Sequence, residues 1–372
     1  MSKLTKYKFS DLYEMSSGIS SSKEQAGHGF PFISFSTVFN NYFLPEELPD
    51  LMDTSLKEQE IFSVKKDDVF ITRTSETVDA LAMSCVVVKD YPKATFSGFV
   101  KRLRPKTTGI VYSKYIAFFL RSKYFRKVLD CNTIMTLRAS FNEDMFSFLY
   151  LYLPDYEEQV RIGDLLYKME MKIRTNNKIN DNLSAMAYDI YMHNFLSKKP
   201  NAKLKDILTE AEKSAIQVGE AKTSKGKYPF FTSGATILKW NEPFVDGRNC
   251  FLNTGGNADV KFYVGKAAYS TDTWSISAKS KMSDYLYLML FSIKPELDQK
   301  FFQGTGLKHL QKPLLKDRPI YVPEKLELEA FNRQVMPMFD IISANTRENQ
   351  QLISLRDWLL PMLMNGQATI SD

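Results

Sequence analysis

The stretch "LPDYEEQVRIGDLLYKMEMKIRTNNKINDNL", Leu153–Leu183, decides the fold, because its pattern recurs as "VPEKLELEAFNRQVMPMFDIISANTRENQQL", Val322–Leu352. Residues of equivalent type lie 169 positions apart without a gap, so that Asn176, for example, matches Asn345. A period of this length indicates two domain-sized halves rather than a solenoid of short repeats. The sequence therefore predicts an internal pseudo-two-fold repeat.

Both copies of this stretch have the four-three spacing of apolar and amide residues that is typical of a coiled-coil seam. If the two helices run antiparallel about a pseudo-two-fold axis, Asn176 should meet Asn345 where they cross. A buried amide pair tolerates one register, since a slip leaves each amide unsatisfied at a cost of about 1–3 kcal/mol. The residues predicted to form the seam and fix its register are Ile173, Asn176, Asn180, Leu183, Ile342, Asn345, Asn349 and Leu352.

The segment that precedes each long helix has a mixed pattern. Strand-like runs include "DVFITRT" (Asp68–Thr74) and "CFLNTGG" (Cys250–Gly256), and "SKYIAFFLRS" and "SDYLYLMLFS" are helical patterns. The predicted class is α/β in the mixed α+β sense, with two globular domains joined by two long antiparallel helices that form a coiled coil. The predicted segments are globular 1–154, helical 155–196, globular 197–323 and helical 324–372 with a C-terminal tail.

Charge is distributed unevenly along the chain, whose net charge is +6. The four predicted segments carry +3, −2, +8 and −3 in chain order. Two basic blocks alternating with two acidic ones suit two surfaces that face a polyanion, although an ordinary basic protein would show the same sum. The cysteines and histidines are scattered singly, which argues against a metal site or a disulfide framework. Neither a signal peptide nor a long apolar run is seen, so a cytoplasmic location is expected.

At this point the residues resemble a known family. The stretch from Leu151 to Leu183 looks like the conserved region that follows a recognition domain in type I restriction-modification specificity subunits. "LRDWLLPMLMNGQ" (Leu355–Gln367) resembles the closing motif of that family, and "GTGLKHLQKPLLKDRPIYVP" (Gly304–Pro323) the end of its second recognition domain. One departure is Ser75, where family members commonly place glycine, which leaves the turn after "FITRT" open.

The resemblance implies a non-catalytic subunit with two target recognition domains, each of which reads one half of a split DNA sequence. The helices would set the unread spacer and dock two methyltransferase subunits, and through these the restriction subunits. S-adenosylmethionine, ATP and Mg²⁺ are then expected on the partner subunits, and no cofactor or metal on this chain. The assembled complex would be an adenine-specific DNA methyltransferase and endonuclease.

Sequence-specific contact with DNA needs cationic donors for guanine edges and phosphates, with hydroxyl groups beside them. Taken singly, each such residue could equally belong to a solvated face. The candidates in the first half are Arg73, Thr74, Lys101, Arg102, Arg104, Lys106 and Arg138. Those in the second half are Lys222, Lys225, Lys227, Thr232, Ser233, Lys239, Arg248 and Lys308. The aromatic residues are interpreted as core rather than as base-stacking groups.

No catalytic residues are predicted, because the sequence contains no phosphate-binding loop, nucleophile elbow or histidine-rich metal spacing. Two alternatives to a DNA-recognition subunit remain at this stage. One is a coiled-coil scaffold that joins proteins without touching DNA, and the other is an enzyme hidden in the variable domains. Salt-sensitive binding to duplex DNA would favour the recognition subunit over both.

Overall fold

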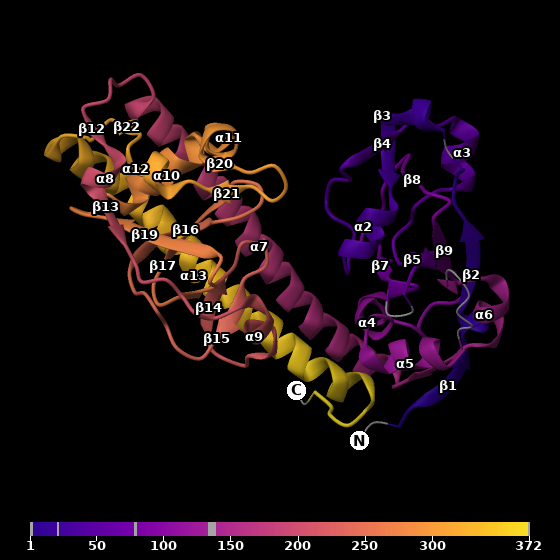
Figure 1. Cartoon of the computed structure of the whole chain (residues 1–372). Coiled ribbons are helices and arrows are strands. Elements are labelled where there is room, and N and C mark those ends of the chain that lie inside the picture. The colour runs from indigo at the N-terminus through magenta and orange to yellow at the C-terminus, as the bar shows by residue number, and fades with distance from the viewer. Residues whose placement is uncertain (1–2, 21, 78–79, 133–138, 371–372) are drawn as a thin grey trace. The chain divides into compact units, whose positions relative to one another are not determined.

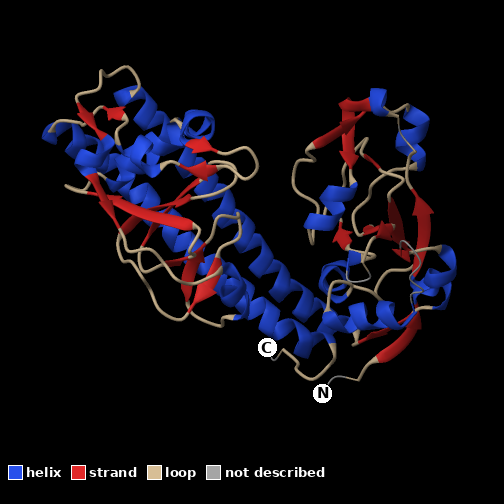
Figure 2. Ribbon diagram, viewed as in Figure 1, coloured by secondary structure: helices blue, strands red, loops and turns tan. Residues whose placement is uncertain are grey.

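The structure is a computed structural model that describes residues 3–20, 22–77, 80–132 and 139–370. Compactness divides the chain into unit 1, Met1–Met171 with Leu352–Asp372, and unit 2, Lys172–Gln351. Helices and strands mix in both units (Figure 2), as the sequence predicts. None of the described helices is both long enough and apolar enough to span a lipid bilayer.

Unit 1 is built around a four-stranded antiparallel sheet in the order β2-β9-β5-β7 (Figure 1). A second sheet has the order β4-β3-β8, with β3 and β8 parallel. Two short pairs, β1-β11 and β6-β10, complete the strands. The bounds are β1 Thr5–Lys8, β2 Tyr13–Ser17, β3 Ala26–Ile33, β4 Asp50–Met52, β5 Val69–Thr72, β6 Thr74–Ser75, β7 Ser84–Val86, β8 Thr95–Phe96, β9 Val100–Pro105, β10 Ala139–Ser140 and β11 Tyr150–Leu153. The helices are α1 Phe9–Leu12, α2 Phe35–Asn40, α3 Leu56–Ile61, α4 Ser113–Phe119, α5 Lys123–Asn132 and α6 Glu143–Phe148.

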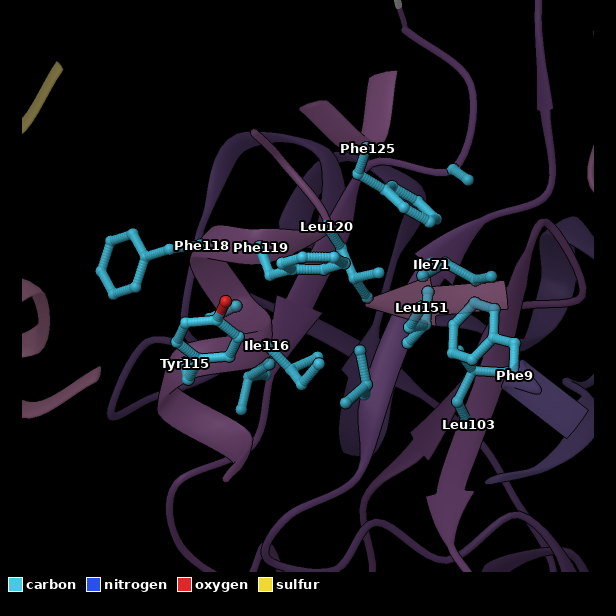
Figure 3. Packing of buried hydrophobic residues seen from close by; sticks show 14 of the residues in the cluster. Phe9, Ile71, Leu103, Tyr115, Ile116, Phe118, Phe119, Leu120, Phe125 and Leu151 are labelled. Carbon is cyan, nitrogen blue, oxygen red and sulfur yellow. The ribbon is translucent and has the colours of Figure 1, made fainter. Parts of the chain in front are cut away.

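The main core of unit 1 is rich in aromatic rings (Figure 3). Strand β5 is buried along its whole length, which explains its continuous apolar run "VFIT". Phe9 packs edge-on against Tyr13 and Phe125, with ring centroids 5.6 and 6.3 Å apart. Such edge-to-face pairs stabilise a core beyond the area that they bury. The core thereby fixes the sheet whose two central strands, β9 and β5, carry or precede the candidate polar residues.

Unit 2 repeats this plan with its own core. Its four-stranded antiparallel sheet has the order β13-β19-β16-β17, and its three-stranded sheet has the order β15-β14-β18, with β14 and β18 parallel. The bounds are β12 Ala202–Lys203, β13 Leu208–Glu210, β14 Tyr228–Phe231, β15 Leu238–Trp240, β16 Arg248–Asn253, β17 Val260–Val264, β18 Ala268–Tyr269, β19 Thr273–Ala278, β20 Phe302–Gln303, β21 His309–Leu310 and β22 Pro319–Ile320. The helices are α8 Leu204–Ile207, α9 Val218–Thr223, α10 Ser283–Ser292, α11 Lys294–Glu296 and α12 Lys312–Lys316.

The two sheets correspond strand for strand. Sheet β2-β9-β5-β7 matches β13-β19-β16-β17, and β4-β3-β8 matches β15-β14-β18, including the single parallel pairing in each. The strands that close each globular part also correspond, since β1 pairs with β11 and β12 pairs with β22. This agreement confirms the duplication and the mixed α/β class that the sequence predicts.

Two helices, α7 (Tyr156–Phe195) and α13 (Lys325–Met364), are each 40 residues long and occupy the predicted helical segments. The side chain of Asp155 caps α7, because its Oδ1 accepts the Glu158 backbone N–H at 2.8 Å. Within unit 2 the two helices are antiparallel, since Asn176 pairs with Asn349 and Asn180 with Asn345 (Figure 1). The predicted antiparallel pairing is therefore confirmed.

The amides form a ladder between α7 and α13 inside unit 2. Asn176 Nδ2 donates to Asn349 Oδ1 at 2.9 Å and to Glu348 Oε2 at 2.7 Å. Asn345 Nδ2 donates to Asn180 Oδ1 at 2.9 Å. The expected pairing of Asn176 with Asn345 is wrong by one helical turn. The pseudo-two-fold axis passes between the two amide pairs rather than through one of them, so each asparagine meets the repeat equivalent of its neighbour.

The other predicted seam residues face inward to different degrees. Ile173, Asn176 and Asn349 are buried, with 8%, 1% and 8% of their surface exposed. The remaining five, Asn180, Leu183, Ile342, Asn345 and Leu352, are half-buried. The amides therefore take a place that apolar side chains would ordinarily fill, as expected for residues that fix a register.

The ladder leads to a test by paired substitution. We expect Asn176→Leu alone to lower the free energy of unfolding by about 1–3 kcal/mol, because the Asn349 carbonyl loses its donor in a buried place. Combining it with Asn349→Leu should recover most of this loss, since both buried amides are then gone and the acceptors that remain, Glu348 and Asn177, are reached by water. Urea unfolding of the full chain measures both. Asn194→Leu is the control, because Asn194 is exposed and bonds only within its own helix. A double variant less stable than the single one would contradict the ladder.

Candidate nucleic-acid interface

Strand β9 carries three of the predicted cations, Lys101, Arg102 and Arg104, and the structure separates them by role. Arg104 Nε and Nη2 each donate to the Asp68 carboxylate at 2.7 Å, and Asp68 is completely buried. Arg102 Nη1 donates to the Ser63 carbonyl at 2.7 Å, and burial lowers the pKa of this guanidinium. These two arginines therefore hold the sheet to the loop after α3, which leaves them a structural role.

The N-terminal end of β9 presents a different group, which we call the Arg73 edge: Arg73, Thr74, Phe99 and Lys101. Arg73 is exposed, and its side chain has no hydrogen-bond or ion-pair partner among the described residues. Its backbone is held from both sides, because its N–H donates to the Phe99 carbonyl at 2.9 Å and its carbonyl accepts from Phe141 N at 2.8 Å. The backbone of Arg73 is therefore held in place, while its guanidinium group remains available to an external partner. A side chain that contacts DNA needs both properties.

Lys101 is the buried member of this edge, with 7% of its surface exposed. Its Nζ donates to Ser17 Oγ at 2.8 Å on the neighbouring strand β2. Burial first, and then the positive charge of Arg73, lower the pKa of Lys101, while Glu143 acts in the opposite direction. A partly desolvated ammonium with one hydroxyl partner retains donors for an anionic or carbonyl oxygen.

Two further candidates of the first half lie elsewhere. Lys106 follows the C-terminal end of β9, where its Nζ donates to the Ser10 carbonyl at 2.8 Å. It therefore lies about 16 Å along the strand from Lys101, from the rise of a strand. Arg138 lies outside the described residues. Of the first-half candidates, the structure brings together Arg73, Thr74 and Lys101.

Ser75 departs from the glycine of the family pattern, and the structure shows why serine is tolerated there: the residue is part of a short strand rather than of a tight turn. Thr74 and Ser75 form β6, which pairs antiparallel with Ala139–Ser140. In unit 2 the equivalent residues are Gly255, which bridges to His309, and Gly256, whose φ of +81° favours glycine. The chain beside Arg73 thus continues as a short strand, where its equivalent in unit 2 turns.

In unit 2 four lysine candidates lie on α9, on the loop between α9 and β14, and on β15. Lys222, Lys225 and Lys227 are exposed and form no ion pair with any residue that the structure describes, whereas Lys239 on β15 is half-buried. We call these four residues the unit 2 lysine patch. Gly226 lies between two of them, where an added Cβ would come within 2.1 Å of the Trp240 carbonyl oxygen. Only glycine permits this close approach, which holds the lysine-bearing loop against β15.

Thr232 and Ser233 follow β14 and divide their roles. Thr232 is buried, and its Oγ1 accepts the Gly234 N–H at 3.1 Å, so that it shapes the turn. Lys261 Nζ donates to the Thr232 carbonyl at 2.8 Å. Ser233 is exposed. Of this pair, only Ser233 has its hydroxyl on the surface.

Arg248 and Lys308 are engaged in ion pairs. Arg248 Nη1 donates to Asp284 Oδ1 at 2.5 Å, its Nη2 contacts Asp340, and 15% of its side chain is exposed. Burial raises the pKa of Asp284 to about 6, which Arg248 opposes. Lys308 Nζ lies 2.9 Å from Asp298 Oδ2 and lowers the pKa of that carboxyl. Arg248 therefore has the same structural role in unit 2 that Arg104 has in unit 1.

The sequence did not point to a cavity of about 250 Å³ at the corresponding sheet end of unit 2. Trp274 faces Leu252 across β19 and β16, as Lys101 faces Ile71 across β9 and β5. The cavity is lined by Trp274 together with Lys213, Thr254, Asp272 and Lys312, among others. Burial lowers the pKa of Lys312, whose Nζ lies 4.9 Å from the Trp274 ring centroid. Aligning the sequence of β5 with that of β16 would have pointed to this site, because it places Thr254 opposite Arg73. A search for clusters of basic residues misses it, because its lysines are isolated in the sequence.

The described residues contain no group of three or more His, Cys, Asp or Glu side chains that could hold a metal ion. What the two sheet ends share is a set of cations and hydroxyls on short loops. Such groups can donate hydrogen bonds to phosphates and to base edges. The chemistry of the site is therefore that of recognition.

Comparison with known proteins agrees with this chemistry. The family model described as "Type I restriction modification DNA specificity domain" matches residues 1–185 and 198–353. The specificity subunit of the type I restriction enzyme HindI from Haemophilus influenzae is 22% identical over 90% of this chain and 94% of its own length. The MjaIX specificity subunit from Methanocaldococcus jannaschii is 19% identical over 98% of this chain and 93% of its own.

A solved structure shows the same fold. The S subunit of a type I restriction-modification system from M. genitalium has a TM-score of 0.66 and 13% identity, covering 97% of this chain and 96% of its own. The family match spans both repeats, which the strand order shows to be copies of one another. The chain therefore belongs to the type I restriction-modification DNA specificity family, and its part is to supply DNA sequence specificity rather than catalysis.

Proposed function

We propose that the two globular parts, 1–154 and 197–323, each read one half of a bipartite DNA target. The observation that carries this proposal is the strand-for-strand repetition of one sheet plan, in which each copy has surface cations of its own: the Arg73 edge in unit 1 and the lysine patch in unit 2. One reading unit present twice in a chain suits a target of two parts. The family match does not favour the alternative of a scaffold that leaves DNA untouched.

Within unit 1, the proposal assigns DNA contact to Arg73, Thr74 and Lys101. Arg73 is free to fork onto guanine O6 and N7 or onto a phosphate, and Lys101 can donate from a partly desolvated place. Within unit 2, the contacts are assigned to the lysine patch and Ser233, with Thr232 as the residue that shapes the turn. The ion-paired residues Arg104 and Arg248 are not among the assigned contacts, because their guanidinium groups are bound to carboxylates within the fold.

The long helices, 155–196 and 324–372, are proposed to set the unread spacer and to dock two methyltransferase subunits, and through them restriction subunits. A helix of 40 residues is about 60 Å long. The amide ladder supports a fixed register for the pair, because a slip would bury unsatisfied amides. S-adenosylmethionine, ATP and Mg²⁺ are assigned to the partner subunits, and the complex to the cytoplasm, where its DNA substrate lies.

The test is DNA binding by the assembled complex, on a duplex that carries the methylated site mapped in cells. We expect the logarithm of the binding constant to fall linearly with the logarithm of salt concentration, because cations displace counterions from phosphates. Arg73→Ala should weaken binding by about 1–3 kcal/mol, roughly 5- to 150-fold, and relax specificity at one position if Arg73 contacts a base. If it contacts a phosphate, the salt slope should fall by about one unit instead.

Lys57→Ala is the matched control, because Lys57 is an exposed cation on α3 of the same unit. It should leave both the affinity and the salt slope unchanged. Binding that is indifferent to salt in the wild-type complex would contradict the proposed function as a whole. An unchanged affinity and slope for Arg73→Ala alone would remove only this residue from the interface.

A further inference from the structure

Phe99 is a large apolar residue that does not belong to the core of unit 1. Its side chain is 68% exposed, the highest value for a phenylalanine among the described residues, whereas Phe70 and Phe96 nearby in the sheets are fully buried. Leaving a large apolar ring in water forgoes the stabilisation that burial would bring. A ring held in this way points to a contact outside the chain.

The loop that carries Phe99 is held firmly. Gly98 N donates to the Ile19 carbonyl at 2.7 Å, and Val100 N donates to the Ser97 carbonyl at 3.0 Å. Phe99 itself donates its N–H to Ser97 Oγ at 3.2 Å, and its carbonyl accepts from Arg73 N at 2.9 Å. Because these four backbone groups are hydrogen-bonded, the ring is presented on a turn that needs little further ordering on binding.

The groups around this loop are those that meet a polyanion. Arg73 is bonded to Phe99 through the backbone, and Lys101 is two residues away. Glu143 is the acidic group that acts on Lys101. The other exposed large apolar residues of unit 1 lie on other elements, for example Leu56 on α3 and Phe148 on α6. A protein-docking surface would instead surround its aromatic anchor with apolar contacts.

We propose that Phe99 inserts as a wedge between two stacked base pairs of the DNA half that unit 1 contacts, while Arg73 and Lys101 hold the flanking backbone. This inference rests on the proposed function and adds a mode of reading to it. Apolar side chains inserted in this way partly unstack a base step and kink the duplex. Because pyrimidine–purine steps unstack most easily, the wedge would select such a step without any hydrogen bond to it.

The test uses the assembled complex and its mapped site, with 2-aminopurine placed in turn at each purine of the half read by residues 1–154, except the methylated adenine. That adenine is excluded because a methyltransferase flips its target base out of the stack. The wild-type complex should raise the fluorescence at one step. Phe99→Ala should abolish this rise and weaken specific binding by about tenfold. Phe99→Leu should retain part of both, since leucine also serves as a wedge.

Phe148→Ala is the control, because Phe148 is the next most exposed phenylalanine of the unit, at 47%. It should behave as the wild type. Unchanged fluorescence and affinity for Phe99→Ala, in a complex that still binds its site, would overturn the wedge and leave the proposed function standing. Loss of partner subunits from the Phe99→Ala complex in a pull-down would overturn it in favour of a protein contact. Failure of the wild-type complex to prefer its site would count against the proposed function itself.

Discussion

Exchanging residues 1–154 for the corresponding segment of another family member should replace one half of the methylated DNA sequence and leave the other half unchanged. Methylation of the original site should be lost altogether, because a single mismatched base pair already costs about 1–3 kcal/mol and several would change at once. Sequencing that detects methylated adenines, in cells with the original and the exchanged chain, measures the result.

The structure indicates why such an exchange should fold. Strand β1 pairs with β11 in the register Thr5 with Leu153, so the two ends of the exchanged segment lie side by side. The junction must preserve the contacts of the segment with the helices, because Ile162, Leu166 and Leu363 share its core. An exchanged chain that folds and still methylates the original sequence would refute the assignment of 1–154 to one half-site.

The matched control is the exchange of residues 197–323, which β12 and β22 close in the same way. It should alter the half of the sequence that the first exchange leaves intact. If both exchanges altered the same half, the division of labour between the two repeats would be wrong.

Asp68→Ala should lower the free energy of unfolding by about 3–5 kcal/mol, the largest loss of stability that we expect from a single polar substitution. Asp68 is fully buried and accepts two hydrogen bonds from Arg104 and one from Lys65 N at 2.8 Å. Its removal leaves a guanidinium without its counter-charge beside a buried cavity. Since Arg104 retains 25% side-chain exposure, water can offset part of this cost, and the lower end of the range is expected. Thermal unfolding should shift downward by roughly 6 to 20 °C.

Two comparisons isolate the cause. The pair Asp68→Leu with Arg104→Met should recover most of the loss, because replacing both partners of a buried ion pair by apolar groups is often neutral. Asp317→Ala removes an exposed partner of Lys205 and should leave the melting temperature unchanged. A double variant as unstable as Asp68→Ala would mean that packing, rather than the unpaired charge, dominates.

The repeat and the helices were predictable because they depend on periodicity, which the sequence displays directly. The seam residues are inward-facing as predicted, yet the pairing of Asn176 was misplaced by one turn. Periodicity fixes which face of a helix turns inward, but the position of a symmetry axis along the helices depends on how the two helices pack against each other. Moving the axis by two residues along the helices changes the partner of every seam residue.

The individual contact residues were harder to predict, for a physical reason. Arg104 and Arg248 look like DNA-binding cations in a list of charges, but their carboxylate partners Asp68 and Asp284 lie 36 residues away in the sequence. Only the fold brings them together. The interpretation of the aromatic residues as core does not single out Phe99, whose exposure is visible only in three dimensions. The DNA contacts of Arg73, Lys101 and the lysine patch remain predictions.

The amide ladder has an evolutionary consequence. The pairs Asn176–Asn349 and Asn180–Asn345 are equivalent by the internal repeat. The repeat offset relates Asn176 to Asn345 and Asn180 to Asn349, so each partner of the first pair corresponds to a partner of the second. A surface of this kind is self-complementary, as in an isologous dimer. A half-length chain with one globular part and one helix therefore has every group that pairing with its own copy requires, so duplication of such a unit accounts for the ladder without any new contact.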